Sequence, residues 1–235
     1  PFLQQDQEVD LGPLIVAVSY KAEEDWETAW QKYYHPIQIS PRLAVVPEWE
    51  EYDAPAGQTV LRMNPGMAFG SGSHDTTRLC LQFLEGVGLS GTEVLDMGCG
   101  SGILSIAALL LGAKSVSAVD IDQLAVKIAH ENAALNGCDD ARLTIRCGNV
   151  LDDPALAGEI GRKSYGVIVA NIVADVIIAM APLFARYLKP DGTLVVSGII
   201  AERAQEVTSH LEQHGFAVSE LREENDWAAA VLRRA

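Results

Sequence analysis

The chain has 235 residues, about half of them apolar, which is enough for one large domain with a sizeable core and a smaller domain. No apolar run reaches the roughly 18–20 residues of a membrane-spanning helix, and residues 1–13, which are polar and acidic, do not fit a secretory signal. The net charge of −15 disfavours a direct grip on nucleic acid, which needs a basic face, and suits a basic partner or ordinary solubility equally well.

Short elements are expected before the repeating part of the chain. We expect strands at residues 14–20, 43–46 and 59–62, and a helix at residues 23–34. That helix carries aromatic residues at i, i+4 and i+7, a stripe that more often packs into a core than forms a binding ledge. The stretch 48–57, with Pro55 and Gly57, is expected to be a linker.

Helices and strands alternate from about residue 64 onward. We expect helices at residues 76–84, 103–111, 123–136, 175–188 and 201–214, and strands at residues 94–96, 116–120, 142–147, 165–170, 192–197, 216–221 and 227–233. The β-α-β repetition requires parallel strands with right-handed crossovers. Only a short turn at Asn225 and Asp226 separates the last two strands, so they should form an antiparallel hairpin. A seven-stranded, mostly parallel sheet with one antiparallel strand is the α/β, Rossmann-like arrangement of class I methyltransferases.

A glycine-rich turn joins strand and helix between Glu93 and Gly102. Its glycines are spaced Gly-x-Gly-x-Gly, not Gly-x-Gly-x-x-Gly as in the dinucleotide fingerprint, and they let a ligand approach the backbone closely. Asp96 precedes them, and a carboxylate there suits the ammonium and sulfonium of S-adenosylmethionine better than a pyrophosphate. We therefore favour S-adenosylmethionine over NAD, with Asp96, Gly98 and Gly100 as contacts. The plain alternative is a tight turn with a capping Asp.

Further cofactor contacts are expected at the ends of the next two strands. Asp120 ends the second strand of the repeating part, where a carboxylate can accept hydrogen bonds from both ribose hydroxyls. Asp122 is the nearest competitor, and we expect it to cap the following helix instead. Asn149 follows the third strand, where it can bond the adenine amine or stabilise a turn.

The segment Asn64–Thr77 is dense in small residues just before a helix, so we expect a mobile loop that closes over the cofactor. Thr76 and Thr77 place hydroxyls at the helix start, where backbone N–H groups favour a ligand carboxylate. Capping of the helix by Ser73 or Asp75 is expected as well.

The same loop carries three further candidates. Phe69 can stack on the adenine or the substrate, or simply pack, and Gly70 beside it is assigned to the cofactor site. His74 is the nearest candidate for a general base. A structural or capping role is the more common one for such a histidine.

Asn171 follows the strand at residues 165–170, whose carboxyl end faces the ligand in this fold. Its side-chain carbonyl can orient an acceptor amine, so it is the main catalytic candidate. The Pro-Pro-Tyr or Pro-Phe tail of enzymes that methylate base amines or glutamine is replaced by Ile172 and Val173. No aromatic clamp for a planar amide is therefore expected at this turn.

These motifs together resemble the PrmA family, whose members methylate a ribosomal protein. The matching segments are residues 25–30, 34–36, 65–77, 96–104 and 169–172. The resemblance implies cofactor contacts at Thr77, Gly98, Asp120 and Asn171. It also implies a partial α+β recognition domain with its linker at residues 1–57, and a methyltransferase domain at residues 58–235. Residues 1–35 resemble only the last part of the family's recognition domain.

A few positions depart from the family pattern. Asn64 replaces a common Asp, Ser71 and Ser73 replace Thr, and Asp75 replaces Pro. These changes bear on the stiffness of the loop and not on the fold.

The resemblance implies transfer of methyl groups from S-adenosylmethionine to lysine side chains or the N-terminal α-amine of a basic, large-subunit ribosomal protein. Lysine methylation of another protein is an alternative, RNA methylation is disfavoured by the acidity, and NAD-dependent oxidation is disfavoured by the terminal hairpin. The four cysteines form no Cys-x-x-Cys pair. We therefore expect a cytoplasmic monomer with reduced thiols, no metal site and no membrane contact.

Overall fold

The structure is a computed structural model that describes residues 31, 34–64, 68–139 and 141–235. The strand expected at residues 14–20 lies outside the described residues, as does nearly all of the helix expected at 23–34. Residues 36–235 form one compact unit, which carries the fold and the site discussed below.

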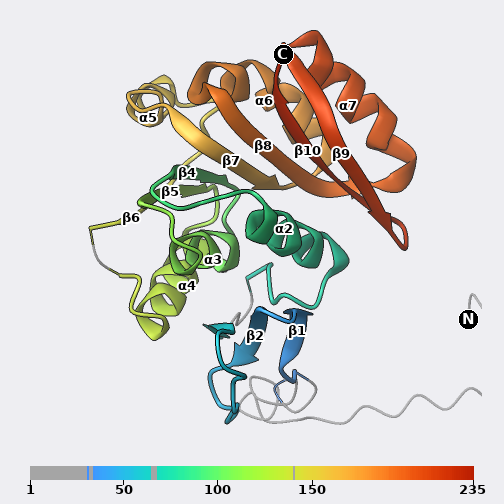
Figure 1. The fold of residues 1–235 in the computed structure, drawn as a ribbon. Helices are drawn as coiled ribbons and strands as arrows, with labels where there is room; N and C mark the ends of the chain where they lie inside the picture. The colour runs from blue at the N-terminus through green and yellow to red at the C-terminus, as the bar shows by residue number, and fades with distance from the viewer. Residues whose placement is uncertain (1–30, 32–33, 65–67, 140) are drawn as a thin grey trace, which may run out of the picture. The chain divides into compact units, whose positions relative to one another are not determined.

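The main sheet of this unit has seven strands in the order β6-β5-β4-β7-β8-β10-β9 (Figure 1). They are β4 (Glu93–Met97), β5 (Ser115–Asp120), β6 (Leu143–Cys147), β7 (Tyr165–Asn171), β8 (Leu188–Ile200), β9 (Phe216–Glu224) and β10 (Trp227–Arg234). Neighbouring strands are parallel except at β10, which runs antiparallel to both β8 and β9. The expected class I methyltransferase topology, with its terminal hairpin, is confirmed.

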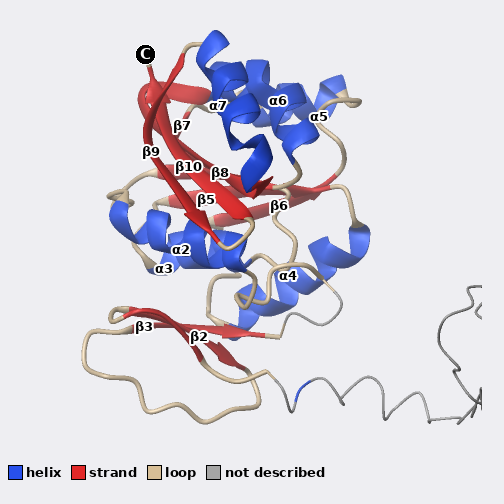
Figure 2. Cartoon of the chain, turned by 90° about the vertical axis from the view of Figure 1, so that its right-hand side faces the viewer, coloured by secondary structure: helices blue, strands red, loops and turns tan. Residues whose placement is uncertain are grey.

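Helices cover both faces of the sheet (Figure 2). The helices α2 (Asp75–Gly86), α3 (Ile103–Leu110) and α4 (Gln123–Leu135) lie on one face, and α5 (Pro154–Ile160), α6 (Ala174–Tyr187) and α7 (Ala204–Gln213) lie on the other. Side chains alternate along β4, so Val94 packs into the core with α2 and α3 whereas Leu95 packs into the core with α6 and α7. A central parallel strand is buried on both faces for this reason.

A small three-stranded sheet packs against the first of these cores. It contains β1 (Ile37–Ser40), β2 (Leu43–Pro47) and β3 (Thr59–Met63), with β1 antiparallel and β3 parallel to β2. Leu43, Val45 and Leu61 are fully buried together with residues of α2 and α3. The small sheet therefore belongs to the compact unit, and the assignment of residues 1–57 to a recognition domain stays a prediction.

Two described elements were not expected from the sequence. Strand β1 is only four residues long and shows no clear alternation of burial. Helix α5 does carry start signals: Pro154 occupies the first turn, and the side chain of Asp153 accepts hydrogen bonds from the N–H groups of Ala155 and Leu156. The helix was missed because it is short, not because its sequence lacks a cap.

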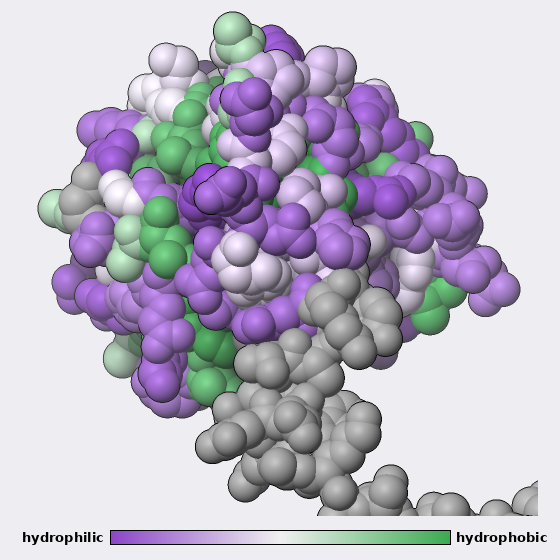
Figure 3. All heavy atoms as spheres, turned by 90° about the horizontal axis from the view of Figure 1, so that it is seen from below, coloured by the Kyte–Doolittle hydropathy of each residue, from purple (hydrophilic) through white to green (hydrophobic). Residues whose placement is uncertain are grey.

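Within the described parts of the chain, every helix is too short or too polar to cross a bilayer. The face seen in Figure 3 is predominantly hydrophilic, with small apolar patches. Four exposed large apolar side chains, those of Phe69, Ile121, Leu151 and Val173, line a single cavity.

Candidate active site

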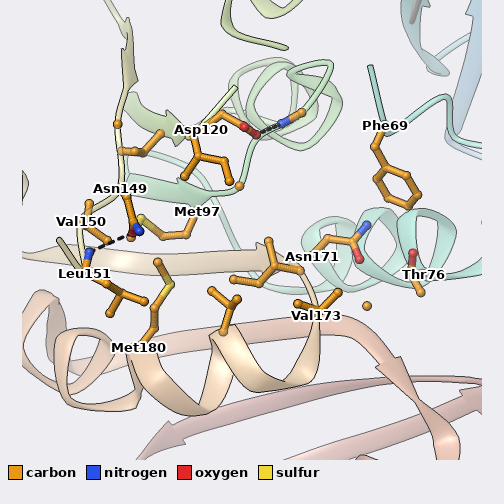
Figure 4. Close-up of a pocket in the computed structure, with 18 of the residues that line it drawn as sticks. Phe69, Thr76, Met97, Asp120, Asn149, Val150, Leu151, Asn171, Val173 and Met180 are labelled. Carbon is orange, nitrogen blue, oxygen red and sulfur yellow. Dashed lines mark hydrogen bonds between the residues drawn. The ribbon is translucent and has the colours of Figure 1, made fainter. Parts of the chain in front are cut away.

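A cavity of about 490 Å³ opens at the carboxyl ends of β4, β5 and β7 and at the loop after β6 (Figure 4). Open parallel sheets bind ligands at this edge, and the volume is typical of a small-molecule pocket. The lining is mostly apolar, with Asp120, Asn149, Asn171, Thr76 and His74 as its polar side chains. None of the described lining residues is Lys, Arg or Glu.

The glycine turn after β4 forms one wall of this cavity. Gly98 has φ +78°, and a Cβ there would lie 2.3 Å from Cγ2 of Ile172. Gly100 has φ +53°, and a Cβ there would lie 2.6 Å from the carbonyl oxygen of Phe69. Both positions therefore need glycine, and the backbone itself lines the cavity. Gly198 at the end of β8 was not expected to contribute, yet it also lines the cavity and abuts the Ile172 backbone.

Asp120 lies at the end of β5 with its carboxylate held by the backbone. Its Oδ2 accepts from the N–H of Gly100 at 2.8 Å, and its Oδ1 accepts from the N–H of Asp122 at 2.9 Å. Each oxygen keeps a further lone pair, so a vicinal diol could still donate to this carboxylate. Asp122 accepts from the N–H of Leu124 and caps α4, which confirms its expected role.

The loop after β6 contributes a largely apolar end of the cavity. Asn149 lines it, but its Oδ1 accepts from the N–H of Leu151 at 3.0 Å and its Nδ2 donates to Asp152 at 2.6 Å. Of the two roles expected for Asn149, the structure shows the turn. Ile121, which is 74% exposed, and Val150 add apolar surface that the sequence analysis did not single out. Their position directly after polar strand-end residues was the available signal.

Asp96 is fully buried behind the glycine turn and does not line the cavity. The hydroxyl of Ser105 donates to its Oδ2 at 2.6 Å, whereas its Oδ1 has no partner. Burial raises the pKa of Asp96 to about 7; the Asp120 charge adds to this rise, and the Ser105 hydrogen bonds oppose it. In this structure Asp96 lies on the α3 side of the sheet because alternation along β4 directs it there, and its expected contact with a cationic ligand stays a prediction.

Asn171 ends β7 with its side chain between α2 and the cavity. Its Nδ2 donates to Oγ1 of Thr77 at 3.3 Å, and its buried Oδ1 has no partner. Thr77 is itself fully buried and does not line the cavity, whereas Thr76 does. The structure therefore brings Thr77 and Asn171 into contact, and their expected contacts with the cofactor stay a prediction.

His74 caps α2 and belongs to a small aromatic group. Its Nδ1 accepts from the N–H of Thr76 at 3.3 Å, so the expectation that Ser73 or Asp75 caps this helix is wrong. The His74 ring lies against Phe69 on one side and Trp227 on the other. A capping histidine was the more common of its two expected roles, and the structure shows it. Trp227 was missed, since its position on the second strand of a hairpin gave no sign of a cavity.

Phe69 and Gly70 take different places. Phe69 is 56% exposed at the edge of the cavity. Gly70 lies outside the lining, and its carbonyl accepts from the hydroxyl of Ser101 at 2.6 Å. A Cβ on Gly70 would lie 2.8 Å from that hydroxyl oxygen, so this glycine serves loop packing. Its expected contact with the cofactor stays a prediction.

The sheet topology, the glycine turn and the acid that ends β5 define this protein as having the class I methyltransferase fold. The crystal structure of a ribosomal protein L11 methylase from Lactobacillus delbrueckii subsp. bulgaricus superposes with a TM-score of 0.76 at 35% identity, covering 86% of this chain and 99% of that chain. A putative RNA methyltransferase from Pyrococcus horikoshii superposes with a TM-score of 0.55 at 20% identity, covering 67% and 80% respectively, which shows the fold alone.

Residues 3–235 match the family model for ribosomal protein L11 methyltransferase (PrmA), and the chain belongs to this family. The ribosomal protein L11 methyltransferase of Acetivibrio thermocellus is 46% identical over 90% of this chain and 64% of its own length. That of Caldanaerobacter subterraneus is 42% identical over 96% and 70%. The chain thus spans about two thirds of the length of these curated relatives.

Proposed function

We propose that this protein transfers methyl groups from S-adenosylmethionine to amino groups of a protein, with ribosomal protein L11 as the first candidate. The observation that carries the proposal is the unpaired, buried Oδ1 of Asn171 at the cavity. A buried carbonyl without a partner is costly in a folded protein. An N–H group of an acceptor amine would satisfy it, which supports the proposal that the site takes an amine.

The cavity residues fit S-adenosylmethionine. The carboxylate of Asp120 suits the ribose hydroxyls, and the apolar side chains of Ile121, Val150 and Leu151 suit a planar base. Gly98 and Gly100 leave the backbone open to a close ligand. When bound, the cofactor would supply a methyl group already activated by its sulfonium.

The lining disfavours the dinucleotide alternative. The described lining residues provide no Lys or Arg for a pyrophosphate, and Asp120 would lie close to its negative charge. The net charge of −15 likewise disfavours RNA and suits a lysine-rich protein segment. We also propose that the protein is a monomer and that it acts in the cytoplasm.

The residues of the site would act mainly by positioning the two reactants. A lysine amine must lose its proton to attack, which costs about 4–5 kcal/mol at pH 7 for an ordinary pKa, and an α-amine near pKa 8 costs far less. Desolvation in the apolar cavity lowers the pKa of the amine. Asn171 then accepts a remaining N–H and aims the lone pair, and this alignment is the main contribution of the chain. His74 stays a candidate base that already serves as a cap.

The proposal is tested in two separate steps. Calorimetry with S-adenosylhomocysteine and, separately, NADH reports which ligand the cavity takes. Transfer of radiolabelled methyl groups to purified L11, to RNA and to lysine-free basic polymer reports the acceptor class. We expect S-adenosylhomocysteine to bind and NADH not to bind. Among the three acceptors, we expect only L11 to be labelled. Labelling of RNA with no labelling of L11 would overturn the acceptor assignment, and binding of NADH alone would overturn the cofactor.

A further inference from the structure

The β9–β10 hairpin brings an aromatic side chain into the wall of the active site. Trp227 is the first residue of β10, directly after the turn, and it lines the cavity. Its ring lies edge-on to His74 with 4.8 Å between the centroids, and the Phe69 ring lies 5.4 Å from His74. The rings of Phe69 and His74, from the loop before α2, therefore meet the ring of Trp227 from the hairpin.

This aromatic group lies at the Asn171 end of the cavity. His74 bonds Thr76, and the adjacent Thr77 bonds Asn171. Figure 4 shows Phe69 and Thr76 on the side of Asn171, away from Asp120 and Asn149. The rings therefore lie toward the end of the cavity that Asn171 lines and not beside the Asp120 carboxylate.

An ionic latch ties the tip of the hairpin to the start of α2. Arg78 pairs with Asp75 at 3.0 Å and with Glu224 of β9. Nδ2 of Asn225, in the turn, donates to Oδ2 of Asp75 at 2.8 Å. Because α2 carries His74 at its N-cap, the latch joins the element that holds His74 to the element that holds Trp227 (Figure 1).

We propose that the β9–β10 hairpin is part of the acceptor site, with Trp227 as a wall that selects an alkylammonium side chain and Arg78 as the positioning residue that holds this wall in place. This inference rests on the proposed function, since it concerns the amine acceptor of the same cavity. Trp227 would touch the acceptor, whereas Arg78 would act only through the hairpin.

Aromatic rings suit the chemistry of such an acceptor. A lysine brings a methylene stem and a cationic head, and ring faces attract both through apolar contact and cation–π interaction. The described lining has no carboxylate other than Asp120, so the rings can favour the cation without fixing its proton through a salt bridge. The amine can then lose its proton and turn its N–H toward Asn171. An acceptor without a flexible apolar stem would gain less from this wall.

The side chains that form the latch are partly exposed to solvent, so salt should weaken their ion pairs. The Arg78 side chain is 29% exposed, and those of Asp75 and Glu224 are 20% and 36% exposed. Such ion pairs are partly screened by salt. Arg222, also on β9, reaches α2 differently, since its guanidinium lies over Phe83 and bonds Gln82. It ties the same two elements away from the Asp75–Glu224 latch, which makes Arg222 a matched control.

Steady-state kinetics on the whole protein with L11 as acceptor test the wall. Trp227→Ala should raise the acceptor KM about tenfold, the order of a lost cation–π contact together with its apolar contact, with S-adenosylhomocysteine affinity unchanged. Trp227→Phe should restore most of the loss. An unchanged acceptor KM in Trp227→Ala, with cofactor affinity also unchanged, would refute the wall. Loss of cofactor affinity in both variants would place Trp227 in the cofactor site and refute it as well.

Fluorescence quenching tests the latch without any substrate. Acrylamide quenching of each variant is compared with that of the same variant carrying Trp227→Phe. The difference between the two isolates the signal of Trp227, because the other tryptophans contribute equally to both. Arg78→Met should expose Trp227 and raise its quenching, Arg78→Lys should restore part of the protection, and Arg222→Met should resemble the wild type. Equal effects of Arg78→Met and Arg222→Met, or none from either, would overturn the latch. Because this measurement needs no methyl transfer, it separates failure of the latch from failure of the proposed acceptor.

Discussion

The side-chain amide of Asn171 donates to the hydroxyl of Thr77 at 3.3 Å and leaves its own buried carbonyl oxygen unpaired at the cavity. The amide N–H₂ group is occupied and the carbonyl oxygen has no partner, so this pair holds the amide in the orientation that the proposed function requires. Thr77 is fully buried on α2, and Asn171 ends β7. The contact therefore links helix, sheet and site.

Removal of the Thr77 hydroxyl should disturb catalysis more than cofactor binding. Thr77→Val keeps the shape but leaves the Asn171 N–H₂ group without its acceptor, which costs about 1–3 kcal/mol of stability. We expect kcat to fall roughly tenfold, because a misdirected amide no longer aligns the amine. Thr77→Ser is the matched control and should stay close to the wild type. A full-rate Thr77→Val enzyme would show that this hydrogen bond does not orient Asn171.

Asp120 should govern cofactor affinity. Asp120→Ala removes a carboxylate that the Gly100 and Asp122 N–H groups hold at 2.8 and 2.9 Å. Two lost hydrogen bonds to a charged acceptor correspond to about 3–5 kcal/mol, a loss of at least a hundredfold in S-adenosylhomocysteine affinity. Asp122→Ala, which removes only the cap of α4, is the control. Near-native affinity in Asp120→Ala, measured by calorimetry, would remove this residue from the site.

The buried Asp96 should make stability depend on pH. Its pKa rises from the model-compound value of 3.8 to about 7 on folding, chiefly through burial, so the folded state binds a proton more tightly than the unfolded state. This contribution is fully present below the unfolded pKa of 3.8 and is lost as the pH rises to the folded pKa of about 7. Wild type should therefore lose on the order of 2–3 kcal/mol between pH 5 and pH 8 relative to Asp96→Asn.

Urea unfolding of both proteins at the two pH values checks this prediction. The asparagine variant keeps the shape without the titration, so its difference from wild type isolates the carboxyl group. Parallel pH dependences in the two proteins would show that Asp96 has an ordinary pKa in the folded chain.

Substitution of Gly98 should lower stability through a steric clash, and a second substitution at Ile172 should relieve that clash. Gly98→Ala places a Cβ 2.3 Å from Cγ2 of Ile172 at a φ of +78°. Strain and overpacking together should cost about 2–4 kcal/mol. Adding Ile172→Ala should recover the steric part, because the Gly98→Ala methyl then has space, and should leave the φ cost. No recovery in the double variant, measured by thermal or urea unfolding, would show that backbone strain accounts for the whole loss.

The fold was largely predictable because its pattern is local. The alternation of strands and helices from β4 onward, and the short Asn225–Asp226 turn, follow from hydrophobic period and turn residues. Strand β1 was not predicted because it is only four residues long and depends on its pairing with β2. Tertiary packing decides such elements, and a single sequence does not display it.

The site was predictable in part, for a related reason. Asp120 and Asn171 end parallel strands, and their meeting at one edge follows from topology. The sequence did not show which way the side chains point: Asp96 lies behind the turn, and of the two buried residues Thr76 and Thr77 only Thr76 lines the cavity. Trp227 lies in a hairpin more than fifty residues after Asn171 in the sequence. It lines the cavity because β10 pairs with β8, and a single sequence does not show this pairing.

The most direct test of the central claim is mass spectrometry of ribosomal protein L11 after incubation with this protein and S-adenosylmethionine bearing a deuterated methyl group. The account predicts labelled methyl groups on lysine side chains or the α-amine, at a rate that Asn171→Ala lowers by at least tenfold while S-adenosylhomocysteine still binds. Asn171→Ala that labels L11 at the wild-type rate, or wild type that binds the cofactor product and labels no amine of L11, would contradict it.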